Sequence, residues 1–132
     1  MARVARVMLV DSDEHMAQSL LTALSGEFDV TWTPDAFQAL RWLGGGDWYD
    51  IILCELELPK MNGLELEAGL AVHDPHLAAR IVFTTERLLE PEVQQLLAGV
   101  PNVVVAKPFD IDALRDLIRR RTAPYAWSPG AM

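Results

Sequence analysis

The chain has 132 residues, of which 51% are hydrophobic and 23% are charged, so we expect one folded domain and exclude general disorder. Eleven Lys and Arg residues against 19 Asp and Glu give a formal net charge of -8. Nucleic-acid-binding domains usually carry a basic surplus, so we expect no direct nucleic-acid partner. No apolar run approaches the roughly 20 residues of a membrane-spanning helix, so we expect no membrane partner either.

Two features of the sequence predict a cytoplasmic protein. The first seven residues, MARVARV, carry positive charge but are not followed by the apolar stretch and cleavage site of a secretory signal. Cys54 is the only cysteine, so the chain has no internal disulfide, as is usual in a reducing compartment.

Short apolar runs alternate with helical patterns along the chain. The runs are too short for helices and favour buried strands. They occupy residues 7–10, 28–33, 51–54, 81–83 and 103–105. Apolar residues at helical spacing follow each run, at 16–24, 36–43, 64–72, 91–97 and 111–118. Gly and Pro residues after these patterns, such as Gly26, Gly44 and Pro75, mark the ends of the predicted helices.

Five successive strand–helix units predict an α/β fold with a five-stranded parallel sheet. The strand at 51–54 has no polar alternation, which indicates burial on both faces, so helices must cover both sides of the sheet. In such sheets, sites form beyond the carboxyl ends of the strands. The polar residues expected at this edge are Asp11, Ser12, Asp13, Glu55, Glu57, Thr84, Thr85 and Lys107.

The sequence contains no glycine-rich phosphate-binding loop. Neither GxGxxG nor GxxxxGK[ST] occurs, and the three glycines at 44–46 are expected to end a helix. Nucleotide binding through a glycine loop is therefore not supported. The candidate site is instead the polar group at the strand ends, in which acids of two neighbouring strands face a hydroxyl and an amine of two others.

Four segments of the chain resemble the receiver domain of bacterial two-component response regulators. They are VMLVD at 7–11, YDIILCELELPKMNG at 49–63, VFTT at 82–85 and VAKPF at 105–109. Pro124, Pro129 and Gly130 argue against a helix at 122–132, so we expect a C-terminal tail or linker there. The resemblance implies a receiver domain at residues 1–121. It also implies the CheY-like, flavodoxin-like (βα)5 fold, with strand order 2-1-3-4-5.

The resemblance also implies a role for each residue of the candidate site. In receivers, an Asp at the end of the third strand accepts a phosphoryl group from a histidine kinase, and acids after the first strand hold Mg²⁺. A Thr or Ser on the fourth strand contacts the phosphoryl group, and the Lys of a Lys-Pro pair binds it. Asp11, Thr84 and Lys107 match these positions. Ser12 replaces the second acid, and Glu55 stands at the phosphoacceptor position.

Both departures fall on the phosphorylation chemistry. Ser12 offers Mg²⁺ a neutral hydroxyl instead of a carboxylate. Glu55 moves its carboxylate by about one bond length, and misplacements of ~1 Å lower rates by a factor of order 100 in such sites. We expect weak or no Mg²⁺ binding, with Asp11, Glu55 and Glu57 as remnant ligands, and no other cofactor. In addition, Val104 stands where many receivers carry an aromatic switch residue.

The favoured interpretation is an atypical receiver, or pseudo-receiver, that serves phosphorelay signalling by binding proteins and is not an enzyme. Its expected partners are a histidine kinase or a downstream output protein, with a possible homodimer through the fourth helix, fifth strand and fifth helix (90–121). There, charge reversal at Arg115 and Arg119 is expected to weaken binding and leave the thermal midpoint nearly unchanged. The alternatives are a receiver still phosphorylated on an acid of the pocket and a flavodoxin-like small-molecule binder.

Three local expectations concern the geometry of the site. Glu55 should pair with Lys107, because an unpaired charge in a partly buried pocket is costly. The Lys107–Pro108 bond should be cis, since X-Pro bonds adopt cis at modest cost and receivers commonly have a cis bond there. Asp13 should start the following helix, where the helix dipole favours an acid.

Overall fold

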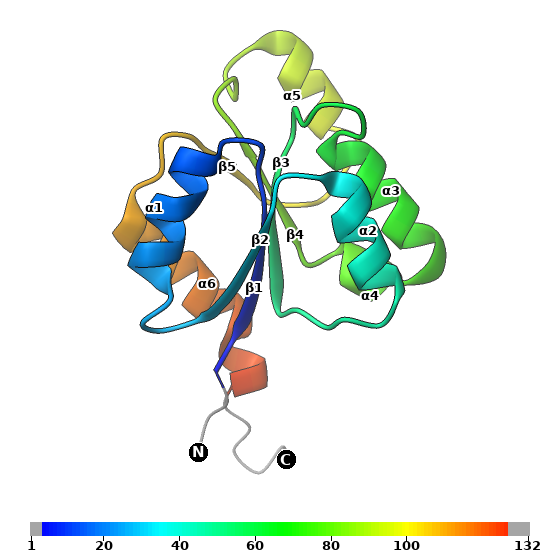
Figure 1. Ribbon diagram of the computed structural model, residues 1–132. Coiled ribbons are helices and arrows are strands. Elements are labelled where there is room, and N and C mark those ends of the chain that lie inside the picture. The colour runs from blue at the N-terminus through cyan, green and yellow to red at the C-terminus, as the bar shows by residue number, and fades with distance from the viewer. Residues whose placement is uncertain (1–3, 127–132) are drawn as a thin grey trace.

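A computed structural model describes residues 4–126, which form a five-stranded parallel sheet between two layers of helices (Figure 1). The strands run in the order β2-β1-β3-β4-β5, and every neighbouring pair is parallel. The predicted fold class and strand order are therefore confirmed. The strands are β1 (Arg6–Val10), β2 (Asp29–Thr33), β3 (Ile51–Glu55), β4 (Ile81–Thr85) and β5 (Val104–Ala106).

The described residues contain one helix more than the five predicted. The helices are α1 (Glu14–Leu24), α2 (Ala36–Gly44), α3 (Gly63–His73), α4 (Pro75–Ala78), α5 (Pro91–Leu97) and α6 (Ile111–Ala126). The additional helix, α4, is too short to show a periodic apolar pattern. It begins because the Asp74 side chain accepts a hydrogen bond from Leu77 N and Pro75 occupies its first turn. The fourth and fifth predicted helices are thus α5 and α6.

Polar side chains cap the first turns of the helices that follow β1 and β3. Asp13 accepts a hydrogen bond from Met16 N at 3.0 Å, so its predicted role at the start of α1 is confirmed. At the start of α3, Asn62 and Glu65 form a capping box, in which each side chain accepts a hydrogen bond from the other residue's backbone N–H. These caps set the directions of α1 and α3 next to the candidate site.

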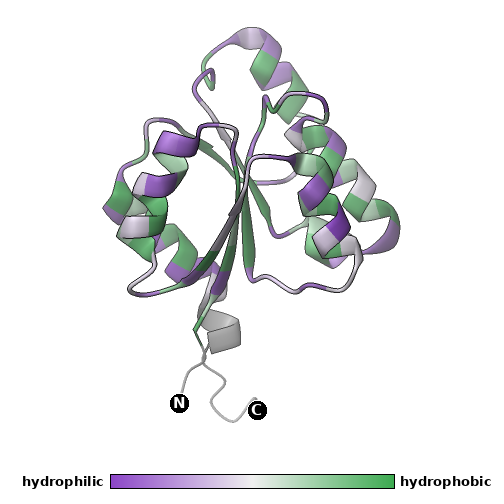
Figure 2. Cartoon of the chain, viewed as in Figure 1, coloured by the Kyte–Doolittle hydropathy of each residue, from purple (hydrophilic) through white to green (hydrophobic). Residues whose placement is uncertain are grey.

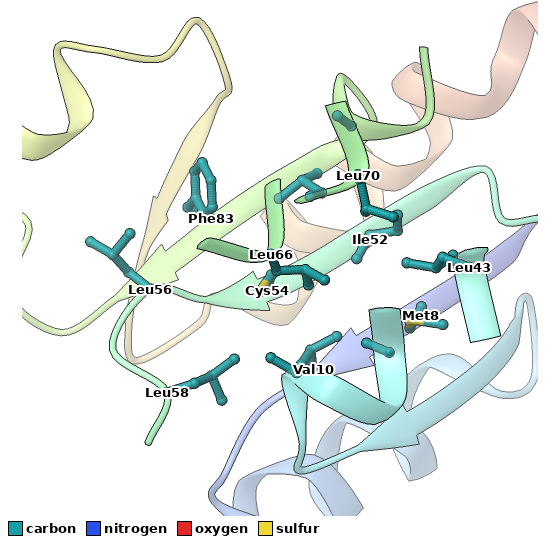
Figure 3. Packing of buried hydrophobic residues seen from close by; sticks show 14 of the residues in the cluster. Met8, Val10, Leu43, Ile52, Cys54, Leu56, Leu58, Leu66, Leu70 and Phe83 are labelled. Atoms are coloured by element: carbon teal, nitrogen blue, oxygen red, sulfur yellow. The ribbon is translucent and has the colours of Figure 1, made fainter. Parts of the chain in front are cut away.

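The sheet has a separate apolar core on each face. One core lies between the sheet and helices α2–α5, and the other lies between the sheet and α1 and α6. In Figure 3, Leu66 and Leu70 of α3 pack over Ile52 and Cys54 of β3. The central strands are hydrophobic along their length, whereas the helices also carry hydrophilic residues (Figure 2). No helix in the described part of the chain is long and apolar enough to cross a membrane.

The last helix continues beyond the predicted end of the domain. We expected residues 122–132 to form a tail, because Pro124 argues against a helix, but α6 ends at Ala126. Thr122 is buried, and its hydroxyl donates to Ile118 O at 2.7 Å. Because the helix ends only two residues after Pro124, the missing N–H removes one hydrogen bond of the last turn. The expectation of no helix there is wrong. The rest of the predicted tail, 127–132, lies outside the described residues.

Two arginines of α6 bind the C-terminal end of α1 and the turn that follows it. Arg119 Nη2 donates to Glu27 Oε1 at 2.7 Å, and Arg115 Nη2 donates to Ala23 O at 3.0 Å. These contacts join α6 to α1. The expectation that charge reversal at Arg115 and Arg119 leaves the thermal midpoint unchanged therefore conflicts with the structure. We now expect reversal at Arg119 to lower the midpoint, and reversal at the neighbouring exposed Arg120 to lower it less.

Candidate functional site

Four predicted site residues meet at the carboxyl edge of the sheet. Asp11 follows β1, Glu55 ends β3, and Lys107 follows β5. Thr84 lies in β4 directly opposite Glu55 in the strand register. Because all the strands are parallel, their carboxyl ends share one edge, and residues up to 96 positions apart in sequence come together there.

The loop after β5 directs Lys107 into this site. Its backbone N–H donates to Thr85 O at 2.8 Å, which extends the pairing of β4 with β5 by one residue. The peptide bond between Lys107 and Pro108 is cis, as predicted. The Lys107 side chain is only 6% exposed, so its charge depends on partners within the protein.

The Lys107 ammonium group lies between two carboxylates. Its Nζ atom is 2.6 Å from Asp11 Oδ2 and 3.1 Å from Glu55 Oε2. The predicted pairing of Glu55 with Lys107 is confirmed. The shorter contact, to the fully buried Asp11, was not anticipated. One cation thus serves two acids.

The second oxygen of Glu55 is bound by Ser12. Glu55 Oε1 accepts from Ser12 N at 3.0 Å and from Ser12 Oγ at 2.8 Å. Asp13 N donates to Asp11 Oδ1 at 2.8 Å, so the backbone after β1 supports both acids. Ser12 acts here as a hydrogen-bond donor to the residue at the phosphoacceptor position. Both oxygens of the Glu55 carboxylate are therefore engaged within the protein.

Burial and the charge imbalance shift the pKa values of this group. Burial raises the pKa of Asp11, and the negative charge of Glu55 raises it further, against the hydrogen bonds from Lys107 and Asp13. Burial by itself lowers the pKa of Lys107. The hydrogen bond to Asp11 and the attraction of both carboxylates outweigh this effect, so the net shift of the Lys107 pKa is upward. Lys107 thus stays protonated between the two acids.

Thr84 lies at the predicted position but makes no hydrogen bond to the carboxylates. Its hydroxyl is fully buried and has no hydrogen-bond partner in the described structure. The Glu55 carboxylate is bound instead by Ser12 and Lys107, which follow β1 and β5. A buried hydroxyl without a partner is unusual, because leaving such a group unpaired costs about 1–3 kcal/mol.

Glu57 lies outside this group and binds Thr85, and Trp32 makes a contact that the sequence did not predict. The Glu57 carboxylate accepts from Thr85 Oγ1 at 2.5 Å. The sequence had suggested Thr85 only as a polar strand end. Trp32 of β2 donates from Nε1 to Asp11 O at 2.9 Å and so holds the backbone next to the site. Nothing in the sequence pattern of β2 indicates this bond, because it depends on the orientation of one indole ring.

The residues present do not fit the Mg²⁺ ion that the fold family implies. Asp11 Oδ2 and Glu55 Oε2 both face the Lys107 ammonium group, and Ser12 Oγ points its proton toward Glu55. Among residues 4–126, no group of three or more His, Cys, Asp or Glu side chains is arranged to hold a metal ion. Mg²⁺ needs several anionic or neutral oxygens in near-octahedral geometry. Weak Mg²⁺ affinity remains a prediction.

The parallel sheet and the Asp–Glu–Thr–Lys group at its carboxyl edge define a signalling domain of the response-regulator class. The chain matches the family model for the response regulator receiver domain over residues 7–119. It belongs to this family, and receiver domains serve two-component signalling.

Curated relatives include Regulator of RpoS from Escherichia coli K12. It is 26% identical over 117 residues, which make up 87% of this chain and 34% of the relative. The aerobic respiration control sensor protein ArcB of the same strain is 31% identical over 118 residues, or 86% of this chain and 15% of ArcB. The chain thus spans about a third or less of the length of these relatives.

Solved structures show the same fold. The receiver domain of Francisella response regulator 1452 superimposes with a TM-score of 0.75 at 22% identity, covering 92% of this chain and 98% of that one. The receiver domain of sensor histidine kinase PA1611 from Pseudomonas aeruginosa, with magnesium in its active site cleft, gives a TM-score of 0.74 at 23% identity and covers 92% and 99%. These likenesses establish the CheY-like architecture.

Proposed function

We propose that this receiver domain acts without phosphorylation, as a protein-interaction module of a two-component pathway. The observation that carries the proposal is the complete engagement of the Glu55 carboxylate: Lys107 binds one oxygen, and Ser12 binds the other through its N–H and its hydroxyl. A carboxylate held in this way has no free oxygen directed at an incoming phosphoryl group.

The charges of the site support the same proposal. Phosphoryl transfer needs cations that neutralise the oxygens of the transferred group. Here the Lys107 ammonium group is already shared by Asp11 and Glu55, and Ser12 supplies no negative charge for a metal ion. In this proposal, the Glu55–Lys107 contact would resemble, in the position of its negative charge, the contact that a phosphorylated acceptor makes. We infer that the domain keeps one arrangement of this site and catalyses no reaction of its own.

The proposed partners are a histidine kinase or a downstream output protein in the cytoplasm. Sensor proteins such as ArcB and the sensor kinase/phosphatase LuxQ of Vibrio vulnificus contain segments similar to this chain. The proposed contact and homodimer surface is the face of α5, β5 and α6, which exposes Leu96 and Val103. Nucleic acid is not among the proposed partners, because of the net charge of -8.

A second candidate function is a receiver that is still phosphorylated. The buried, unpartnered Thr84 hydroxyl favours it, because this group is available to bind an added phosphoryl oxygen. In that case Glu55 or a neighbouring acid must first leave Lys107. The two functions therefore differ in whether the Glu55–Lys107 contact breaks.

The experiment is incubation of the protein with acetyl phosphate and Mg²⁺, followed by intact mass measurement. Our proposal expects no mass increase, whereas a gain equal to one phosphoryl group would establish the second function. The Ser12→Asp, Glu55→Asp double variant is the matched control, because it restores both acids of the family pattern and should gain the phosphoryl mass. Partner binding that is unchanged by the phosphodonor would further support the proposal.

A further inference from the structure

A second polar cluster lies beside the site. In it, one buried hydroxyl both donates and accepts a hydrogen bond. Thr85 is 2% exposed, and its Oγ1 donates to Glu57 Oε1 at 2.5 Å while accepting from Arg87 N at 3.0 Å. Arg87 Nη1 lies 3.8 Å from Glu57 Oε2. The cluster therefore connects the loop between β3 and α3 to the loop between β4 and α5.

The same cluster reaches the beginning of α5. The Arg87 guanidinium group pairs with the Glu90 carboxylate, and Glu90 N donates to Arg87 O at 3.0 Å. Glu90 is the N-cap residue directly before α5, and its own side chain makes no capping bond to the helix. The position of the 86–90 segment, and with it the first turn of α5, thus depends on residues that contact Glu57 and Thr85.

The 86–90 segment forms one wall of a surface depression of about 440 Å³. Leu88, Leu89 and Glu90 line it on this side, and Ala106 and Lys107 line it on the other. Lys107 also binds Asp11 and Glu55, so the depression touches the site directly. Leu89 is 86% exposed, which leaves an apolar side chain at the rim.

We propose that Glu57 and Thr85 form a latch that holds the 86–90 segment and so sets the shape of this depression. The inference rests on the proposed function, because it names the residues that control a surface of the interaction module. The Glu57 side chain is 38% exposed, so a basic side chain of a partner can reach it. Such a cation competes with Thr85 for the carboxylate and releases the segment. Partner binding would then open the latch.

Hydrogen exchange measured by mass spectrometry tests the latch on the unphosphorylated protein. In Glu57→Ala and Thr85→Val, exchange in residues 86–90 should be at least about tenfold faster than in the wild type, because a charge-assisted hydrogen bond or its acceptor is lost. Thr85→Ser keeps the hydroxyl and should exchange as the wild type does. Glu86→Gln is the matched control, since it removes the same charge from within the 86–90 segment and leaves the Thr85–Glu57 bond in place.

Faster exchange confined to the latched segment in Glu57→Ala and Thr85→Val supports the proposal. It is overturned if Glu57→Ala exchanges as Glu86→Gln does, or if exchange in β3 rises by the same factor, which would indicate general destabilisation. A phosphoryl mass gain in the acetyl phosphate experiment would refute the proposed function without changing these exchange rates. The two failures are therefore distinguishable.

Discussion

At the scale of single residues, the site is a case of one cation shared by two carboxylates. Lys107 lies 2.6 Å from the buried Asp11 and 3.1 Å from Glu55, whose second oxygen has Ser12 as a further donor. Asp11 depends on Lys107 more than Glu55 does, because Asp11 is fully buried. Glu55, the acid at the phosphoacceptor position, is thus the acid that depends less on the charge of Lys107.

This asymmetry predicts unequal costs for two substitutions. Lys107→Met leaves the Asp11 charge buried without a cation and should lower the free energy of unfolding by about 3–5 kcal/mol. Glu55→Gln keeps the Asp11–Lys107 pair and should cost about 1 kcal/mol. Chemical denaturation at pH 7 measures both values. Equal losses for the two variants would contradict the greater dependence of Asp11 on Lys107.

Because the Cys54 thiol is buried, we expect the stability of the protein to fall at alkaline pH. Burial raises the pKa of its thiol above the ordinary value of 9.0, with Glu55 and Asp11 adding to the effect. Above pH 9.0 the unfolded chain therefore loses this proton first, and the free energy of unfolding should fall by about 1.4 kcal/mol per pH unit. Lys107 has a raised pKa, so its contribution is lost only above 10.5.

Chemical denaturation at several pH values between 9.0 and 10.5 measures this slope. Cys54→Ala is the control, because it removes the thiol and should flatten the curve in this range. If the variant and the wild type show the same slope, other groups account for the alkaline loss.

At the scale of elements, α3 approaches the end of β3 more closely than a side chain allows. A Cβ atom on Gly63 would lie 2.8 Å from Glu55 O and 3.2 Å from the Cα atom of Leu56. Gly63 N also donates to Leu56 O at 3.0 Å, so neither backbone segment can shift without losing this bond. The start of α3 and the position of Glu55 are therefore linked.

Two glycines of α3 give a matched test of this link. Gly63→Ala should destabilise the protein by about 1–3 kcal/mol, because the added methyl group overlaps with backbone. Gly69→Ala, in the same helix, meets only the Leu40 side chain at 3.6 Å and should stabilise by about 0.5–1 kcal/mol. Thermal denaturation distinguishes the two. A stabilised Gly63→Ala protein would contradict the close approach.

At the scale of the whole molecule, metal binding should be visible as a change in global stability. A ligand that binds only the folded state raises the thermal midpoint, by an amount that grows with the logarithm of its concentration divided by its Kd. Because the site of the wild type does not fit Mg²⁺, millimolar Mg²⁺ should leave its midpoint unchanged. The Ser12→Asp, Glu55→Asp double variant regains two family acids, and its midpoint should rise with Mg²⁺. Calorimetric titration measures the affinities, and a sub-millimolar wild-type value would contradict the prediction.

The sequence alone determined the architecture and the edge of the sheet at which the site lies. Buried strands such as Ile51–Glu55 are apolar at almost every position, and this pattern can be recognised in the sequence without knowing which strands lie beside them. The parallel topology then places Asp11, Glu55, Thr84 and Lys107 at one edge. Opposite charges in a partly buried site also made the Glu55–Lys107 pair predictable.

Only the tertiary structure decided how these side chains share their partners. The Asp11–Lys107 contact, the two bonds from Ser12 to Glu55, and the bond from Thr85 to Glu57 depend on side-chain rotamers. These rotamers are set by strand register and packing between residues distant in sequence. The helical end of α6 likewise required the structure, because packing that buries Thr122 outweighs the local preference of Pro124. Local sequence patterns predict the strands, the helices and the edge of the sheet that carries the charged residues. Which donor binds which acceptor depends on the tertiary structure, because several of each lie within reach.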